Sequence, residues 1–124
     1  MLDLAVIVVN YNTRDLLRDC LRSIQESVGS ASYKVVVVDN CSSDESAAMV
    51  RCEYPWVHRL IETDHNGGYA YANNLGLRAM GYGKDSPAET LPRYALLLNP
   101  DTLLPPDALQ DMLDFMDANP ELGI

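Results

Sequence analysis

Short apolar runs alternate with stretches of helical periodicity along this chain. Four runs have the β-branched or leucine-rich composition of buried strands, and they cover residues 4–9, 35–38, 57–61 and 95–98. The third is the least regular, because His58 and Arg59 lie within it. The last, Ala95 to Leu98, is predicted to be buried on both faces of a sheet.

Each apolar run is followed by a predicted helix. The first begins at an N-cap, Thr13, and has an apolar stripe at Leu16, Leu17, Cys20, Leu21, Ile24 and Val28. The second is expected over residues 43–52, opened by a capping box of Ser42 and Glu45.

Two further helices complete the pattern. The third is expected over residues 69–80, and one of its faces carries Ala70, Asn74 and Leu77. The fourth starts after Pro105-Pro106, and its apolar stripe consists of Leu109, Met112, Leu113 and Met116.

The order βαβαβαβα predicts a single domain over residues 1–124. Alternating strands and helices favour a three-layer α/β/α fold, a mostly parallel sheet with helices on both faces. The polar segment 84–93 is expected to be a surface loop, and residues 120–124 resemble the start of a further strand. We therefore expect the chain to be truncated.

Composition and charge exclude several classes of function. The chain is 48% hydrophobic and 22% charged, as in soluble globular proteins. Its net charge of −9 argues against binding to nucleic acid or to an anionic membrane surface. From the interrupted apolar run at residues 4–9 we expect neither a signal peptide nor a membrane span, and the three cysteines show neither zinc-site spacing nor a disulfide framework. We expect a cytoplasmic protein, in which any contact with the inner face of the membrane is made by missing parts.

Polar side chains follow three of the four predicted strands. They are Asn10 and Asn12, Asp39 and Asn40, and Asn99 and Asp101. Because the carboxyl ends of parallel strands meet at one edge of a sheet, these groups are expected to line one crevice, joined by Asp64 or Asn66. Each of them, taken alone, is equally an ordinary loop residue or helix cap.

Asn99 and Asp101 are the candidate metal ligands. They offer two hard oxygen donors on one side of a tight turn, which suits Mg²⁺ or Mn²⁺. The alternative is that Asn99-Pro100-Asp101 is only a turn. Gly67-Gly68 fits neither phosphate-loop pattern. If a diphosphate binds, we therefore expect a cation at Asp101 to supply most of the positive charge.

Four motifs, in order over nearly the whole chain, resemble the N-terminal half of family 2 glycosyltransferases. The matching segments are residues 6–12 (VIVVNYN), 36–44 (VVVDNCSSD), 66–76 (NGGYAYANNLG) and 96–101 (LLLNPD). The rhamnosyltransferase-like branch is the most similar, because there the usual D-x-D motif takes the form N-x-D. The resemblance implies a GT-A fold that binds a nucleotide-diphosphate sugar, a dTDP- or UDP-sugar, with Mg²⁺ or Mn²⁺.

The resemblance also implies a role for each motif. Asn10, Tyr11 and Asn12 would border the base, Asp39 would hydrogen-bond the pyrimidine edge, and residues 66–74 would wall the nucleotide pocket. Asn99 and Asp101 would lie at the ribose and metal. The full set implied is Val9, Asn10, Tyr11, Asn12, Asp39, Asn40, Asn66, Gly67, Gly68, Asn74, Asn99 and Asp101.

The reaction implied is inverting hexosyl transfer to a carbohydrate or lipid-linked acceptor, as in cell-surface polysaccharide biosynthesis. The catalytic base of such enzymes lies in the acceptor-binding half, so none is assigned here, and we expect this piece alone to be inactive. Two alternatives stay open. One is a non-catalytic nucleotide-binding or interaction module, and the other is a receiver-type signalling domain with Asp39 as phospho-acceptor.

Overall fold

The computed structural model describes residues 1–83 and 86–122. Its strands are β1 (Leu4–Asn10), β2 (Tyr33–Asp39), β3 (Arg59–Glu62) and β4 (Tyr94–Leu98). Its α-helices are α1 (Arg14–Gln25), α2 (Ser46–Glu53), α3 (Tyr69–Ala79) and α4 (Ala108–Ala118). The predicted alternation of strands and helices is confirmed, with a short 3₁₀ helix, Ala88–Thr90, inside the expected loop.

The described strands form a parallel sheet in the order β3-β2-β1-β4. Asn10 lies opposite Asp39, and Val8 lies opposite Leu98, so the strands end nearly level. From β1 the chain first moves to β2 on one side, and β4 later joins β1 on the other side. The carboxyl ends of β1 and β4 therefore flank a topological switch point, where open α/β sheets bind ligands.

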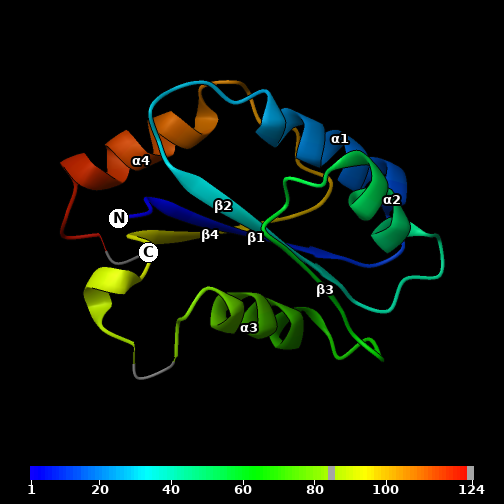
Figure 1. Ribbon diagram of the computed structural model, residues 1–124. Coiled ribbons are helices and arrows are strands. Elements are labelled where there is room, and N and C mark those ends of the chain that lie inside the picture. The colour runs from blue at the N-terminus through cyan, green and yellow to red at the C-terminus, as the bar shows by residue number, and fades with distance from the viewer. Residues whose placement is uncertain (84–85, 123–124) are drawn as a thin grey trace.

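Helices cover both faces of the sheet, as predicted. Figure 1 shows α1, α2 and α4 on one face and α3 on the other. Alternate residues of β1 separate the two cores, because successive side chains of a strand point to opposite faces. Val6 and Val8 pack with α1, α2 and α4, whereas Ile7 and Val9 pack with α3.

β4 corrects one prediction. It is an edge strand with alternating burial, and it is not buried on both faces. Leu96 and Leu98 pack into the core beneath α1 and α4, but Leu97 on the α3 side is 45% exposed. The reason is that α3 lies over β1, β2 and β3. An apolar run alone does not indicate which strand lies at an edge.

The helix boundaries also differ from the predictions. α1 ends at Gln25, so Val28 lies outside it, and Leu16 on α1 is 48% exposed. α2 starts at Ser46 without the predicted capping box, because Glu45 adopts a left-handed conformation with φ of 66°. The stripe of α4 is confirmed by buried Leu109 and Leu113 and by the half-buried side chains of Met112 and Met116.

The buried face of α3 lies apart from Ala70 and Asn74, which share a face with Leu77. Its buried residues are Ala72, Asn73 and Gly76, whereas Ala70 and Asn74 are exposed. A Cβ atom at Gly76 would lie 2.5 Å from Cγ2 of Ile7, so α3 packs on the sheet as closely as its backbone permits. This close approach explains why small side chains form the buried face.

Two predictions concern residues near the gaps. Residues 120–122 form a turn and not a strand, and residues 123–124 lie outside the described part. Of the predicted surface loop 84–93, residues 84–85 also lie outside it. Within the described residues, no helix is long and apolar enough to cross a membrane.

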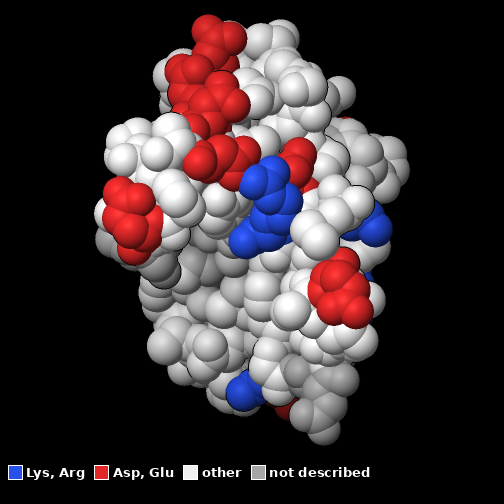
Figure 2. Space-filling view, turned by 90° about the vertical axis from the view of Figure 1, so that its left-hand side faces the viewer, with Lys and Arg blue, Asp and Glu red and all other residues white. Residues whose placement is uncertain are grey.

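Acidic groups gather on the side of the molecule where α4 ends. Figure 2 shows them there around a small basic cluster. Arg93 pairs with Asp3 (Nη1–Oδ1, 3.0 Å) and with Asp117, and so connects β4 to both the N-terminus and α4. Such exposed ion pairs contribute little stability, typically below about 1 kcal/mol each.

Cys20 is expected to resist thiol reagents. Its side chain is fully buried on α1, with Sγ 3.9 Å from the carbonyl oxygen of Asn99. Burial, with a contribution from the charge of Asp101, raises the pKa of the Cys20 thiol to about 11. At pH 8 the thiol is therefore protonated, and only the thiolate reacts.

Cys41 and Cys52 are exposed. We expect a chromogenic disulfide reagent at pH 8 to titrate these two thiols in the native protein and all three after unfolding in guanidinium. Rapid reaction of three thiols without denaturant would contradict the burial of Cys20.

Candidate functional site

Asp39, the last residue of β2, is held by hydrogen bonds from two neighbouring segments. Its Oδ1 accepts from Nδ2 of Asn10 at 3.0 Å and from Oγ of Ser42 at 2.7 Å. Its Oδ2 accepts from the N–H of Ser42 at 3.0 Å. The residue is only 4% exposed. A carboxylate can accept about four hydrogen bonds, so Oδ2 retains one acceptor position.

The loop after β1 is hydrogen-bonded to the loop after β2. Thr13 is the N-cap residue of α1, as predicted, but its Oγ1 donates to Oδ1 of Asn10 at 2.6 Å and makes no capping hydrogen bond to the helix. Asn12, with φ of 51°, donates its N–H to Oγ of Ser42 at 2.9 Å. Its Oδ1 accepts the N–H of Ser43 at 2.8 Å. Ser42 thus hydrogen-bonds to Asp39 and Asn12 and does not cap α2.

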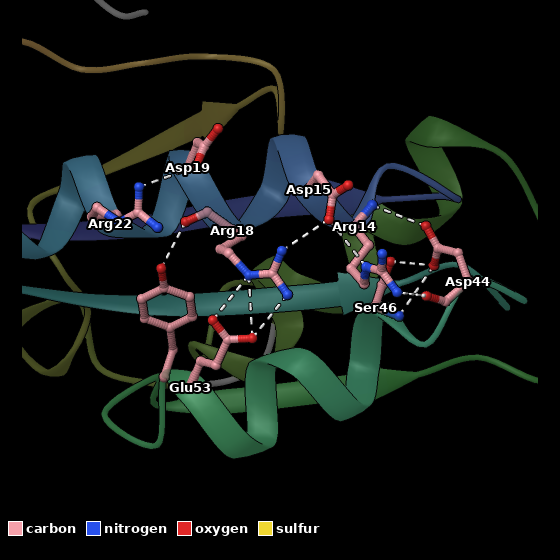
Figure 3. A network of polar contacts seen from close by, with 9 residues as sticks. Arg14, Asp15, Arg18, Asp19, Arg22, Asp44, Ser46 and Glu53 are labelled. Atoms are coloured by element: carbon pink, nitrogen blue, oxygen red, sulfur yellow. Dashed lines mark hydrogen bonds and ion pairs between the residues drawn. The ribbon is translucent and has the colours of Figure 1, made fainter.

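Asp44 caps two helices at once. Its Oδ2 accepts the N–H of Arg14 at the start of α1 at 2.9 Å. Its Oδ1 accepts the N–H of Ser46 at the start of α2 at 3.1 Å, and also the Ser46 hydroxyl. Figure 3 shows Asp44 between the two helix starts. One carboxylate therefore fixes both loops that carry Asn12 and Asp39.

We expect Asp44→Ala to lower the free energy of unfolding by about 1–3 kcal/mol, since each lost cap typically costs about 0.5–2 kcal/mol. Burial opposes ionisation of Asp44, but the hydrogen bonds from Ser46 and Arg14 outweigh it, and the pKa of the carboxyl lies below 3.8. This stabilisation is therefore complete above the ordinary aspartate pKa and is lost as the pH falls through the lower folded value.

Urea denaturation at pH 7 and at pH 3 measures both effects. The loss caused by Asp44→Ala should be smaller at pH 3 than at pH 7. Asp19→Ala, which removes an exposed carboxylate of α1, is the matched control and should change stability by less than about 0.5 kcal/mol. An equal loss at both pH values would contradict the assigned role of the charge.

Asn40 connects the end of β2 to the loop before α3. Its Nδ2 donates to Oδ1 of Asn66 at 2.8 Å and to the carbonyl of Gly68 at 3.2 Å. Its Oδ1 accepts from Oγ1 of Thr63 at 3.2 Å. Asn40, which is 2% exposed, and Asn66 thus hold the end of β2 next to the loop before α3.

Two glycines directly precede α3, so the backbone there carries no side chains. Gly68 is the N-cap, with φ of 95°, and a Cβ there would meet no atom within 4 Å. At Gly67 a Cβ would lie 2.4 Å from the Tyr71 ring, so only glycine fits. Next to this turn, Nδ1 of His65 lies 2.6 Å from Oδ1 of Asp64, a pair that no sequence pattern indicated.

Asn99 and Asp101 follow β4 on the other side of β1. The Tyr69 hydroxyl at the start of α3 lies 3.5 Å from Oδ1 of Asn99, so this side chain connects α3 with the turn after β4. Asp101 is exposed, and the Thr102 N–H donates to the Asn99 carbonyl at 3.1 Å, which closes the turn.

The donor set fits a cation that takes most of its ligands from a bound molecule. Among the described residues, no group of three or more His, Cys, Asp or Glu side chains converges on one point. Asp101 supplies one carboxylate and Asn99 one amide oxygen. Mg²⁺ is commonly bound through one or two carboxylates together with substrate phosphates and water, so these residues fit such an ion.

The predicted residues come together to different extents. Asn10, Asn12, Asp39 and Asn40 form one connected cluster, and Asn66, Gly67 and Gly68 adjoin it through Asn40. Asn99 and Asp101 lie across β1 at the same edge, as predicted. Tyr11 is 48% exposed beside the cluster, and Val9 packs beneath it.

Three residues differ from the predicted site. Asn74 is exposed on α3 and makes no hydrogen bond to the cluster within the described part of the chain. The sequence reasoning assigned no site role to Ser42 and Asp44. Ser42 and Asp44 lie three and five residues after Asp39, a spacing typical of side chains that close turns. This spacing could have indicated their role.

Comparison with known proteins identifies relatives over nearly the whole chain. The family model described as "Glycosyl transferase family 2" matches residues 5–124. The succinoglycan biosynthesis protein ExoO of Rhizobium meliloti is 31% identical over 116 residues, which make up 94% of this chain and 30% of that protein.

Two solved structures share the fold. A mannosyltransferase from Pyrobaculum calidifontis, in complex with GDP-Man and Mn²⁺, has a TM-score of 0.78 and 28% identity, covering 97% of this chain and 33% of that one. TarS of S. aureus, residues 1–349 in complex with UDP-GlcNAc, has a TM-score of 0.76 and 22% identity, covering 94% and 32%. This chain thus spans about a third of the length of each of these three proteins.

Proposed function

The chain belongs to glycosyl transferase family 2, and we propose that its strand-end cleft binds a nucleotide-diphosphate sugar with a divalent cation. The sugar is then transferred to an acceptor hydroxyl by the protein of which this domain is part. The observation that carries the proposal is the placement of Asp39 and Asp101 at one edge of the sheet, on either side of the switch point.

Asp39 is proposed to recognise the base. Asn10 and Ser42 occupy three of its acceptor positions, and the position left on Oδ2 suits an N–H donor. Uracil and thymine present such a donor at N3, whereas cytosine presents an acceptor there. The cleft is therefore expected to favour UDP- or dTDP-sugars over CDP-sugars. Asn10, Tyr11 and Asn12 border the base in this arrangement.

Asp101 and Asn99 are proposed to hold Mg²⁺ or Mn²⁺ at the diphosphate. When bound, the ion stabilises the negative charge that develops on the leaving diphosphate. The likeness to a structure that holds GDP-Man and Mn²⁺ supports this assignment. Within this chain, the turn after β4 orients the two oxygen donors, and the Tyr69 hydroxyl keeps Asn99 near α3.

The finer assignments are part of the proposal. We propose inverting hexosyl transfer, and the N-x-D form of Asn99-Pro100-Asp101 supports a rhamnosyltransferase-like donor. The base that deprotonates the acceptor is proposed to lie outside this chain. We propose a carbohydrate or lipid-linked acceptor and a cytoplasmic location. A relative named for succinoglycan biosynthesis supports a part in cell-surface polysaccharide synthesis.

Calorimetric titration of the chain with UDP, dTDP, GDP and CDP, each with Mn²⁺ and with EDTA, tests the proposal. We expect UDP or dTDP to bind more tightly with Mn²⁺ than with EDTA, and CDP to bind at least about tenfold more weakly. A folded protein that binds none of these diphosphates in the presence of Mn²⁺ would overturn the proposal.

A signalling receiver function receives less support. A receiver domain needs an acidic pair after its first strand, beside the phospho-acceptor. Here β1 ends in Asn10, which donates to Asp39, and Tyr11 and Asn12 follow it. A non-catalytic nucleotide-binding module is the remaining alternative. It shares the cleft with the leading proposal, and assays of sugar transfer by a protein that contains this domain separate the two.

A further inference from the structure

The position of Asp101 depends on the backbone of the turn that carries it. Its side chain is exposed, and within the described residues no group donates a hydrogen bond to the carboxylate. The Thr102 N–H closes the turn on the Asn99 carbonyl at 3.1 Å. The Tyr69 hydroxyl, 3.5 Å from Oδ1 of Asn99, is at the limit of a hydrogen bond. Neither contact fixes the direction in which the chain continues after the turn.

The chain after Asp101 is held along α1. The Leu104 N–H donates to Oγ of Ser23 on α1 at 3.1 Å. Further on, the Val28 N–H, just past the end of α1, donates to the Pro106 carbonyl at 2.9 Å. Figure 1 shows this connection between β4 and α4 passing beside α1. The bond to Ser23 is the nearer of the two to Asp101, three residues away in the chain.

The Ser23 hydroxyl is set up to accept this bond. A serine hydroxyl has one donor and two acceptor positions, and the donor of Ser23 is used within α1, on the Cys20 carbonyl at 2.6 Å. Sγ of Cys20 lies 3.9 Å from the carbonyl oxygen of Asn99. Cys20 and Ser23 therefore contact the two ends of segment 99–104, and Asp101 lies between these ends.

Leu104 has a second contact with the protein interior. Its side chain packs against the core cluster that contains Leu17, Cys20 and Leu21 of α1. Apolar contact of this kind is non-directional, whereas a hydrogen bond fixes the orientation of a peptide group. The bond to Ser23 is therefore the contact that sets the direction of the backbone beyond Asp101.

We propose that Ser23 is a positioning residue for the metal site. Through the Leu104 N–H it holds the Asn-Pro-Asp turn so that Asp101 and Asn99 present their oxygens to one cation. This inference rests on the proposed function and deepens it, because it assigns support of the metal ligands to a half-buried residue of α1. Groups that support metal ligands typically contribute about 10- to 100-fold to metal affinity.

The test measures Mn²⁺ affinity from the electron paramagnetic resonance signal of free Mn²⁺, in the presence of saturating UDP. We expect Ser23→Ala to weaken Mn²⁺ binding about tenfold, the lower end of that range, because Ser23 acts through a single peptide group. Its affinity for uridine, measured by calorimetry, should stay at the wild-type value. Ser23→Thr keeps a hydroxyl that can bond the carbonyl three residues before it in a helix, and should restore most of the Mn²⁺ affinity.

Ser27→Ala is the matched control. Oγ of Ser27 also donates to a carbonyl of α1, that of Ser23, at 3.3 Å, but within the described residues it makes no hydrogen bond to the connection after β4. This variant should bind Mn²⁺ like the wild type. Wild-type Mn²⁺ affinity in Ser23→Ala, or an equal loss of Mn²⁺ and uridine affinity, would overturn the inference and leave the proposed function standing. If the wild-type protein binds no Mn²⁺ together with UDP, both fail.

Discussion

Replacing Asp101 by alanine is expected to abolish the dependence of diphosphate binding on Mn²⁺. Asp101 is the one carboxylate of the Asn-Pro-Asp turn, and no group of three metal-ligating acids, His or Cys exists in the described residues to replace it. Even groups that only support metal ligands typically contribute about 10- to 100-fold to affinity or activity. The affinity for the nucleoside diphosphate in Mn²⁺ should therefore fall by about 100-fold.

The affinity for the free nucleoside should stay unchanged in Asp101→Ala, because the proposed base contacts lie across β1 at Asp39. Asp107→Ala provides the control, since Asp107 is an exposed carboxylate nearby on the same connection, and it should leave both affinities at the wild-type value. Calorimetry in Mn²⁺ measures the affinity of each of the two variants for UDP and for uridine. Unchanged Mn²⁺ dependence in Asp101→Ala would rule out this residue as the ligand.

Asp39→Ala is expected to reduce stability and base recognition together. It removes the acceptor of three hydrogen bonds, one from the buried Asn10 amide and two from the half-buried Ser42. The Asn10 amide then keeps only its 3.4 Å contact with Oγ of Ser42. Each buried group left unpaired costs about 1–3 kcal/mol, although neighbouring losses are not additive. We expect the free energy of unfolding to fall by about 3 kcal/mol in urea denaturation.

Asp39→Asn separates recognition from stability. It keeps the shape of the side chain and one acceptor oxygen, but it presents a donor where the proposed base requires an acceptor. Affinity for UDP should fall by about 10- to 100-fold, as for the loss of a hydrogen bond to a charged group. Affinity for CDP should fall less.

Asp64→Ala is the control for both Asp39 variants, because it removes an exposed carboxylate at the same edge of the sheet. It should change stability by less than about 0.5 kcal/mol and leave nucleotide affinity unchanged. A stable Asp39→Ala protein with wild-type affinity for UDP would refute the assigned position of the base.

The candidate site was predictable as a set of strand ends, but its internal connections were not. Asn10, Asp39 and Asp101 could be placed at one edge because parallel strands end on the same side. That Ser42 bonds Asp39 and that Asp44 joins α1 to α2 depends on loop conformation, including the positive φ of Asn12 and Glu45. Local propensity favoured a capping box at Ser42, and the tertiary contacts with Asp39 and Asn12 overrode it.

The sequence by itself determined the alternation of strands and helices, the parallel sheet and the ends of the strands that carry polar groups. These features follow from hydrophobic period and chain order, which are local properties. Only the tertiary structure decided that β4 lies at the edge with Leu97 exposed, and that α3 buries Asn73 in place of Asn74. Those outcomes depend on which elements pack against one another, since the burial of a side chain is a property of the neighbours that reach it.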